Sequence, residues 1–190
     1  MKFLYPTCNL GKADMVFNHA TDPAYMAVLD IATYDKDMAD WDYHRLTAKI
    51  ASQMEQERIF AWGCPECDLQ IRITANPPSG SNFHPVESVS GFLATSGQLC
   101  FTSYDNLTMC AQFKEYHFPD HEDRPFTIEP GRYQITVHRM FHWQHGEQSP
   151  ESIEEGDHFI IALRPAPSSA PSLRFDSVPW AWRPAKSDQA

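Results

Sequence analysis

One stretch, the alternating run from Phe126 to Arg139, constrains the fold of this chain more than any other. Its lead-in contains a Glu-Pro-Gly turn at residues 129–131, where proline presets φ and glycine supplies the φ > 0 position. Tyr133, Ile135 and Val137 then fall on one face, and polar or charged residues stand between them. A period of two with β-branched and aromatic residues is typical of a half-buried antiparallel strand, so we expect a β-rich fold.

Shorter apolar runs elsewhere in the chain indicate further strands. We expect them at residues 12–17, 25–32, 59–62, 69–74, 92–94, 99–101 and 158–163. The connections at residues 63–68 and 95–97 are short and turn-like, so each of them predicts a β-hairpin. Residues 158–163 are nearly all apolar, which favours a central strand.

Residues 41–57 form the one convincing helical pattern of the sequence. Leu46, Ile50 and Met54 recur at a spacing of four, which places them on one face of a helix. Asp40 or Asp42 can cap its start, because a carboxylate accepts the free N–H groups there and suits the positive end of the helix dipole. We expect this helix to cover one face of a sheet.

The elements together predict a mainly β (β-rich α+β) fold, an antiparallel β-sandwich or curled sheet with one packed helix. The 190 residues suit a single domain, which we place at residues 1–164, and we find no internal repeat. Residues 165–190 are rich in Pro, Ser and Ala and are expected to form a C-terminal tail, because proline removes ladder donors. Trp180 and Trp182 predict that this tail folds back onto the body or, less often, anchors a partner.

The charge of the chain narrows its range of partners. A net charge of −10 argues against a nucleic-acid binder and against an anionic membrane surface, since both need a basic patch. It suits either a basic protein partner, through complementary fields, or plain solubility. The odd count of five cysteines, with no visible signal peptide or long apolar run, predicts a cytoplasmic protein.

Two acidic segments are candidate contact surfaces for a basic partner. Between residues 144 and 157 the chain has no Lys or Arg, and its acids are our predicted partner-binding residues. They are Glu147, Glu151, Glu154, Glu155 and Asp157. A second acidic patch consists of Asp35, Asp37, Asp40 and Asp42. The alternative for both segments is an ordinary solvated loop.

Cys64 and Cys67 form the most conspicuous chemical motif, a CxxC. A structural zinc site needs four ligands, and His142 and His145 are the candidates to complete it. A redox role favours a cysteine at a helix N-terminus, whereas a strand pattern follows here. The simplest interpretation is a hairpin turn that carries two thiols.

Other constellations do not establish an enzyme. The loop from His117 to Asp123 offers histidine and carboxylate ligands, so it is a second candidate metal site. The sequence has no nucleophile elbow and no glycine-rich phosphate loop. We therefore predict no catalytic residues, no cofactor and no bound metal, and we consider an enzyme less favoured than a binding protein.

The order of these elements resembles small bacterial β-rich proteins of the competence protein J type and related immunity-like families. The resemblance rests on residues 69–73, on residues 91–101 and on the Pro130-Gly131 turn with its alternating strand to Val137. It implies a non-catalytic inhibitor or immunity-type protein that neutralises a basic partner such as a nuclease or toxin. The alternatives are a metal-binding protein or metal-dependent hydrolase that uses the His and Cys loops, and a structural domain.

The alternating strand generates a test of the predicted fold. Ile135→Ala should lower the free energy of unfolding by roughly 2–5 kcal/mol, because it removes buried methyl groups and leaves a cavity. Urea unfolding followed by far-UV circular dichroism measures this loss. A change within the error of the midpoint would mean that this face of the strand lies in solvent.

Overall fold

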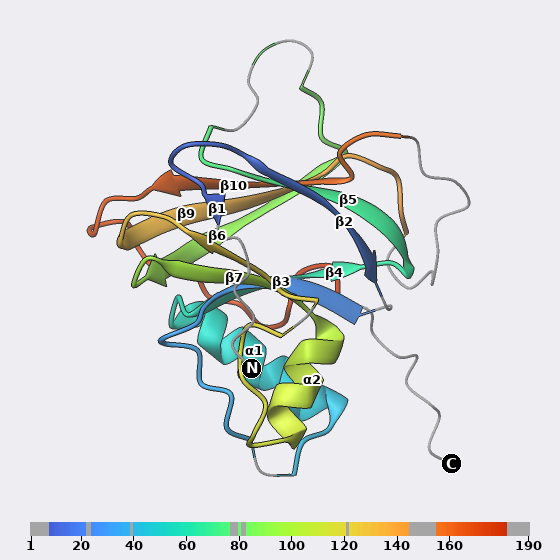
Figure 1. Cartoon of the computed structure of the whole chain (residues 1–190), viewed down its shortest axis with the longest axis vertical. Helices are drawn as coiled ribbons and strands as arrows, with labels where there is room; N and C mark the ends of the chain where they lie inside the picture. Colours follow the sequence, from blue (N-terminus) through green and yellow to red (C-terminus); the bar gives the residue numbers. More distant parts are fainter. Residues whose placement is uncertain are drawn as a thin grey trace.

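A computed structural model describes residues 8–21, 24–38, 40–76, 80, 83–120, 122–144 and 155–181. In these residues ten strands form two five-stranded sheets that pack face to face, and two helices lie on one side of them (Figure 1). The elements are β1 Cys8–Asn9, β2 Met15–Thr21, β3 Ala24–Asp30, α1 Tyr43–Glu55, β4 Ile59–Cys64, β5 Cys67–Thr74, β6 Glu87–Thr95, β7 Gln98–Ser103, α2 Tyr104–Gln112, β8 Arg124–Thr127, β9 Gly131–Arg139 and β10 Phe159–Pro165. This confirms the β-rich sandwich with a packed helix.

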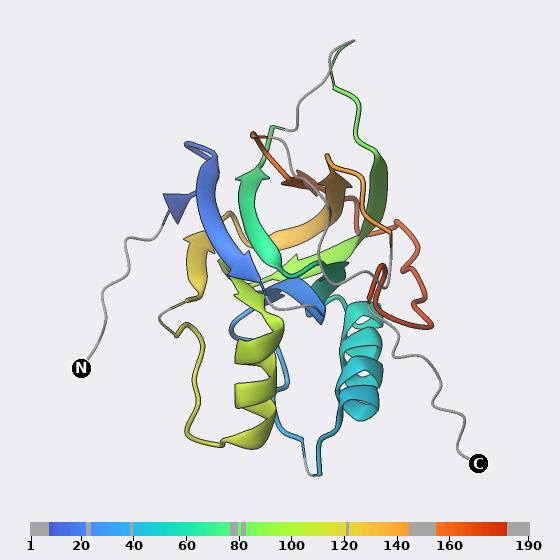
Figure 2. The same ribbon diagram turned by 90° about the vertical axis from the view of Figure 1, so that its right-hand side faces the viewer.

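The first sheet has the order β1-β8-β7-β3-β4 and is enclosed on both faces. Figure 2 shows α1 and α2 on its one side and the second sheet, β2-β5-β10-β9-β6, on its other side. Every residue of β3 and β4 is buried as a result. Aromatic rings join the two sheets, with centroids 5.0 Å apart for Phe17 and Phe101 and 6.2 Å apart for Trp62 and Phe159.

The two most periodic segments fold as their patterns predict. In β9 the side chains of Tyr133, Ile135 and Val137 are buried, and the strand pairs antiparallel with β6 and β10. In α1 the apolar face is buried against the first sheet, and Asp42 is the N-cap, whose carboxylate accepts from the Arg45 N–H at 2.9 Å. The pattern of each segment fixes its buried face, which is why these predictions hold.

Both predicted hairpins are wrong, because each connection carries the chain from one sheet to the other. β4 lies at the edge of the first sheet, whereas β5 lies in the second sheet. β6 and β7 are divided between the sheets in the same way. Pro65 has no N–H for a hairpin bond, and its carbonyl accepts from the Thr21 hydroxyl, which holds the corner between the sheets. Alternation shows which face of a strand is buried. The same alternation is found whether the next strand pairs with it in a hairpin or lies in the other sheet.

The structure also contains a second helix, α2, and a repeat of topology that the sequence does not reveal. In β2-β3-α1-β4-β5 the outer strands pair in the second sheet, and the inner strands pair in the first. The succession β6-β7-α2-β8-β9 has the same arrangement. Helix α2 is short and buries Asn106 and Thr108 beside its apolar residues, so it has no clear amphipathic pattern. Within the described residues, neither helix is long and apolar enough to cross a membrane.

The described part of the proline-rich segment lies against the body. The Gly63 N–H donates to the Pro179 carbonyl at 2.7 Å, and Trp180 stacks on Phe159 with centroids 6.4 Å apart. A β-carbon on Gly63 would lie 1.8 Å from the Trp180 carbonyl oxygen, so only glycine allows this contact. Trp182 lies outside the described residues, and the division into a domain of residues 1–164 and a tail of residues 165–190 stays a prediction.

A buried carboxylate fixes the corner between β6 and β7. Asp30, at the end of β3, is fully buried and accepts five hydrogen bonds, from Ala32, Thr33, Thr95 and twice from Ser96, at 2.6–3.0 Å. Burial alone would raise the pKa of Asp30, but the hydrogen bonds outweigh it and hold the pKa below its ordinary value. The ionised form is therefore the one that the fold stabilises.

Asp30→Asn should lower the free energy of unfolding at neutral pH by about 3 kcal/mol or more, because hydrogen bonds to a charge are lost and an amide group must be buried instead. The lowered pKa means that this stability is present above the unfolded pKa and is lost as pH falls through the folded one. Urea titrations between pH 7 and pH 3 should therefore show a steeper acid decline for the wild type than for the variant. Asp37→Asn, at an exposed carboxylate, is the control. Parallel pH curves for wild type and Asp30→Asn would contradict the assignment.

Candidate functional site

The predicted partner-binding acids fall on the segment that leads into β10. Glu147, Glu151 and Glu154 lie outside the described residues. Glu155 is exposed, and Asp157 is half-buried. The structure therefore places two of the five predicted residues, both just before the start of β10, and their role in partner binding stays a prediction.

Asp157 forms an ion pair that the acidic segment itself does not supply. Its carboxylate lies 2.7 Å from Nε of Arg72, which projects from β5. The same guanidinium reaches Asp14 at 3.2 Å. The hydrogen bonds that Arg72 donates to both acids raise the pKa of Arg72, with the bond to Asp157 as the largest cause. One arginine is thus shared by two carboxylates, and it fixes the end of the acidic segment on the second sheet.

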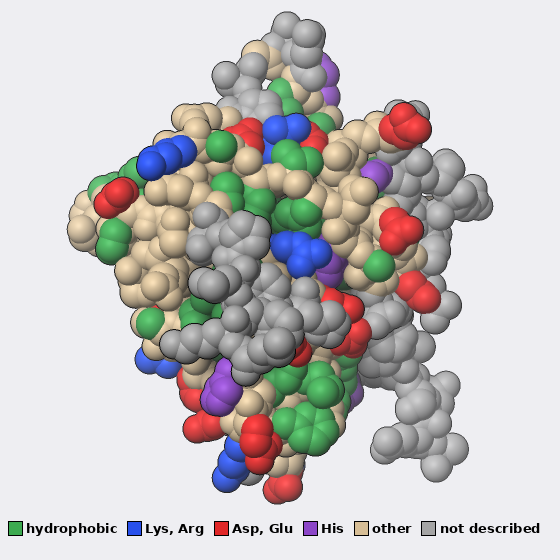
Figure 3. All heavy atoms as spheres, in the orientation of Figure 1, with side chains coloured by type: hydrophobic (Ala, Val, Ile, Leu, Met, Phe, Trp, Pro, Cys, Tyr) green, Lys and Arg blue, Asp and Glu red, His purple; other side chains and the backbone are tan. Residues whose placement is uncertain are grey.

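Beside this ion pair lies an open groove of about 440 Å³. It runs over β2, β5 and the residues just before β10, and most of its lining residues have polar side chains. The lining residues are Asn18, Asp68, Leu69, Gln70, Glu155, Gly156 and His158. Acidic side chains lie along the right-hand side of Figure 3, where Figure 1 places the end of β2 and the start of β5. The fold therefore brings the exposed carboxylates of Asp68 and Glu155, far apart in the sequence, to one hollow.

Strand pairing sets the pattern of the groove floor. On the solvent face of the second sheet, Asn18 lies opposite Gln70, and Ala20 lies opposite Asp68. The backbone N–H of Gln70 donates to Nδ1 of the His158 ring at 2.7 Å, and the backbone N–H of His158 donates to the Gln70 carbonyl at 2.9 Å. The first bond holds the imidazole and makes Nδ1 an acceptor, so Nε2 carries the hydrogen of the neutral ring. The carboxylate and amide oxygens of the groove suit a bound cation or hydrogen-bond donors, whereas the Nε2–H of His158 can only donate.

Sequence reasoning missed Asn18, Asp68, Gln70 and His158 as members of one site. The signal for Asp68 was weak, namely its outward position in the alternating run of β5. No local pattern connects β2 and β5 with the residues before β10, because these segments meet only through sheet pairing. The site is a consequence of topology.

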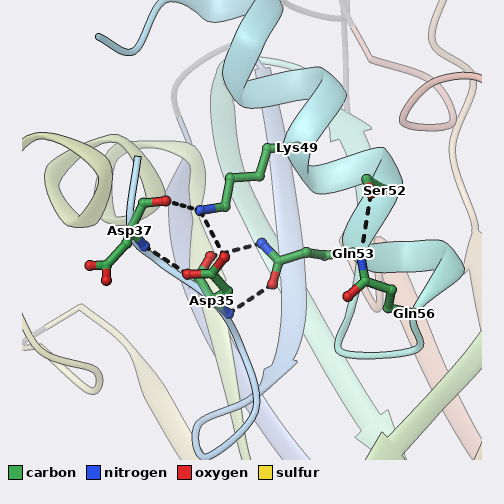
Figure 4. A network of polar contacts seen from close by, with 6 residues as sticks. All are labelled: Asp35, Asp37, Lys49, Ser52, Gln53 and Gln56. Atoms are coloured by element: carbon green, nitrogen blue, oxygen red, sulfur yellow. Dashed lines mark hydrogen bonds and ion pairs between the residues drawn. The ribbon is translucent and has the colours of Figure 1, made fainter. Parts of the chain in front are cut away.

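The second acidic patch, Asp35 to Asp42, is bound to α1. Figure 4 shows that the Gln53 side chain bonds both the N–H and the carbonyl of Asp35, each at 2.8 Å. Lys49 lies 3.4 Å from the Asp35 carboxylate and also donates to the carbonyl of Asp37. Asp42 serves as the helix cap described above. This patch holds a loop against a helix, so the groove is the better candidate for a partner.

The thiols of the CxxC motif are poor reagents in this fold. Cys64 is buried, and burial followed by the charges of Asp68 and Glu66 raises the pKa of the Cys67 thiol to about 11. A protonated thiol is neither a ready nucleophile nor a ready ligand. His142, one of the two histidines considered for a zinc site, is exposed, and His145 lies outside the described residues.

The predicted metal loop at residues 117–123 has a structural centre instead. Asp123 is fully buried, and its carboxylate accepts from the Asn106 amide and from the Asp120 N–H, both at 2.7 Å. Burial raises the pKa of Asp123. Among the residues that the structure describes, no three His, Cys, Asp or Glu side chains are grouped to hold a metal ion. His121 lies outside those residues.

Two solved structures are similar to this chain. One is described as crocagin biosynthetic gene J, with 16% identity, 80% of this chain and 96% of that chain covered, and a TM-score of 0.49. The other is ComJ, inhibitor of the DNA degrading activity of NucA, from Bacillus subtilis, with 12% identity, the same coverage and a TM-score of 0.48. The resemblance to competence protein J is thus confirmed among solved structures. No family model and no curated protein sequence matches the chain.

Metal content tests the CxxC motif. Protein purified without chelator should carry far less than one zinc per chain, because a protonated, half-buried Cys67 binds zinc weakly. Inductively coupled plasma mass spectrometry on the full chain measures this ratio. Stoichiometric zinc that disappears in both Cys64→Ser and Cys67→Ser, but persists in Cys8→Ser, would restore the metal-protein alternative.

Proposed function

We propose that this chain is a non-catalytic, acidic binding protein of the inhibitor or immunity type, which acts in the cytoplasm on a basic protein. A nuclease or toxin is the partner class that the resemblance to competence protein J implies. The observation that carries the proposal is the groove, where Asp68 and Glu155 line one hollow while the neighbouring Arg72 is already held by two carboxylates.

The electrostatics of the groove support a cationic partner surface. The pairing of Arg72 with Asp14 and Asp157 leaves three charged groups with a net negative charge beside two further exposed acids. Glu147, Glu151 and Glu154 precede the groove in sequence, and we include them in the same contact surface. Like charges gathered in one place raise the local potential, steer a basic protein to the site and reject acidic ones.

The overall charge of the chain agrees with this role. A net charge of −10 repels nucleic acid, so an inhibitor of this kind would meet a nuclease through the enzyme's own basic surface. On such an enzyme, the carboxylates of the inhibitor would occupy the sites that bind the phosphates of nucleic acid. The inhibition would then be competitive with nucleic acid and would weaken as salt rises.

Reversing two groove charges should slow association with the partner. Asp68→Lys with Glu155→Lys should lower the association rate constant roughly tenfold at low ionic strength, because steering is lost. The difference should shrink near physiological salt, where the Debye length is about 8 Å. The measurement is stopped-flow association with the purified product of a neighbouring gene, at two salt concentrations.

Glu115→Lys with Glu129→Lys is the matched control, since both residues are exposed and the change in net charge is the same. The fold should survive in each variant, because surface changes usually stay within about 0.5 kcal/mol. Equal rates for the two double variants would remove the groove from the interface. A set of neighbouring gene products that neither bind the chain nor lose nuclease or toxin activity in its presence would contradict the function itself.

A further inference from the structure

The edge strands of the two sheets differ in how far other segments cover or bond them. The edge at β4 is covered by the C-terminal segment through the bond from Gly63 to Pro179. At the edge of β6, the N–H of Ala94 donates to the carbonyl of Glu57. The edge at β1 is only two residues long. β2 is the remaining edge strand, and it pairs with β5 alone along seven consecutive residues.

β2 also lacks the usual features that prevent strand addition. Its residues Met15–Thr21 include no lysine, arginine, acid or proline, and its ladder with β5 has no bulge. Val16 on its solvent face is 43% exposed. In the part of the chain that the structure describes, no backbone N–H or carbonyl of β2 bonds to a backbone group outside β5. Such an edge is a ready template for a strand from another molecule.

We propose that β2 is the docking strand for an extended, basic segment of a partner protein, which joins the second sheet as a sixth strand beside β2. The sign of the partner's charge rests on the proposed function, whereas the open edge is an observation of its own. The groove lies beside the same strand, because Asn18 belongs both to β2 and to the groove lining. Backbone pairing would supply affinity, and the groove would supply specificity.

The solvent face of β2 predicts which side chains the added strand carries. Neighbouring strands lie about 4.8 Å apart, so a residue of the added strand beside Ala20 faces Asp68 across one small side chain. A lysine or arginine there can lay its stem over the Ala20 methyl group and bring its charge to the Asp68 carboxylate. At the other end, Val16 lies opposite Arg72, which is already paired. An apolar side chain fits there and a further cation does not.

On its solvent face, at every second residue, the added strand should therefore carry a basic residue beside Ala20, a polar residue beside Asn18 and an apolar residue beside Val16. This order distinguishes strand addition from a general attraction between an acidic surface and a basic protein. A simple charge contact needs no backbone N–H groups and no order of side chains. The two interactions can thus be separated by changing the backbone of a probe and keeping its charge.

The probe is the capped heptapeptide Thr-Lys-Val-Thr-Thr-Val-Thr, added to the full chain. Its matched control is the same peptide with N-methyl groups on two consecutive central residues, which removes one N–H from each edge. We expect the first peptide to slow hydrogen exchange of amides within Met15–Thr21 and to shift their NMR signals, and the methylated peptide to bind at least about tenfold more weakly.

A substitution in the chain gives the reciprocal test. Val16→Lys places a cation on the edge and should weaken the peptide about tenfold, because lysine opposes strand addition and repels the basic probe. Val86→Lys is the control, since Val86 is similarly exposed at 38% and lies before β6. A thermal melt of each variant confirms that it is folded.

Any one of four outcomes would overturn the inference. Equal binding of the two peptides would show a charge contact alone and would leave the proposed function intact. Perturbations confined to amides outside β2, or no perturbation by either peptide, would exclude the edge. Protection of β2 that grows with chain concentration without peptide would mean that a second copy occupies it. Unchanged partner association in the groove variants, with normal peptide pairing at β2, would instead count against the groove of the proposed function and leave the open edge intact.

Discussion

The structure depends on one constraint, the burial of both faces of the first sheet. Helices α1 and α2 cover one face, and the second sheet covers the other (Figure 2). β3 and β4 can contribute no solvent-facing residue, which explains their continuous apolar sequences. Strands β3 and β7 are each entered from a strand of the second sheet, and β4 and β8 each follow a helix. The crossings at Pro65 and at Ser96-Gly97 are therefore corners of the sandwich. Each corner is held by a hydrogen bond to another strand, from Thr21 to Pro65 and from Ser96 to Asp30.

The same constraint decides which charges hold the fold and which remain available. Asp30 is buried at a corner and is fully hydrogen-bonded, so its ionisation stabilises the sandwich. Asp35 is held by Lys49 and Gln53 against α1 (Figure 4). Arg72 is shared by two acids on the outer sheet. What remains on that outer sheet is a groove with exposed carboxylates, and these charges are the basis of the proposed binding role.

The outer sheet is the exposed one, and its two distinctive features lie together. The groove and the open edge of β2 share Asn18 and the pairing of Ala20 with Asp68. A partner that approached the acidic groove would meet the open edge of β2 in the same sheet. Charge would then govern the approach, and backbone pairing would govern how long the complex lasts.

Local periodicity determined part of this protein from the sequence alone. The alternation of Tyr133, Ile135 and Val137 fixed a strand and its buried face, and the spacing of Leu46, Ile50 and Met54 did the same for α1. The acidity of the segment before β10 was equally plain. Short α2 was missed because Asn106 and Thr108 occupy buried positions of its helix face.

Only the tertiary structure decided which strands share a sheet. A period of two indicates that one face of a strand is buried. The pattern is the same whether the next strand lies in the same sheet or in the sheet across the core. Both predicted hairpins were wrong for this reason. For the same reason, the sequence did not reveal that Asp68 and Glu155 line one groove. The pairing of Arg72 with Asp157 likewise required β5 and β10 to lie side by side. Contacts between distant segments carry no local signature, because their energy arises only after the layers have packed.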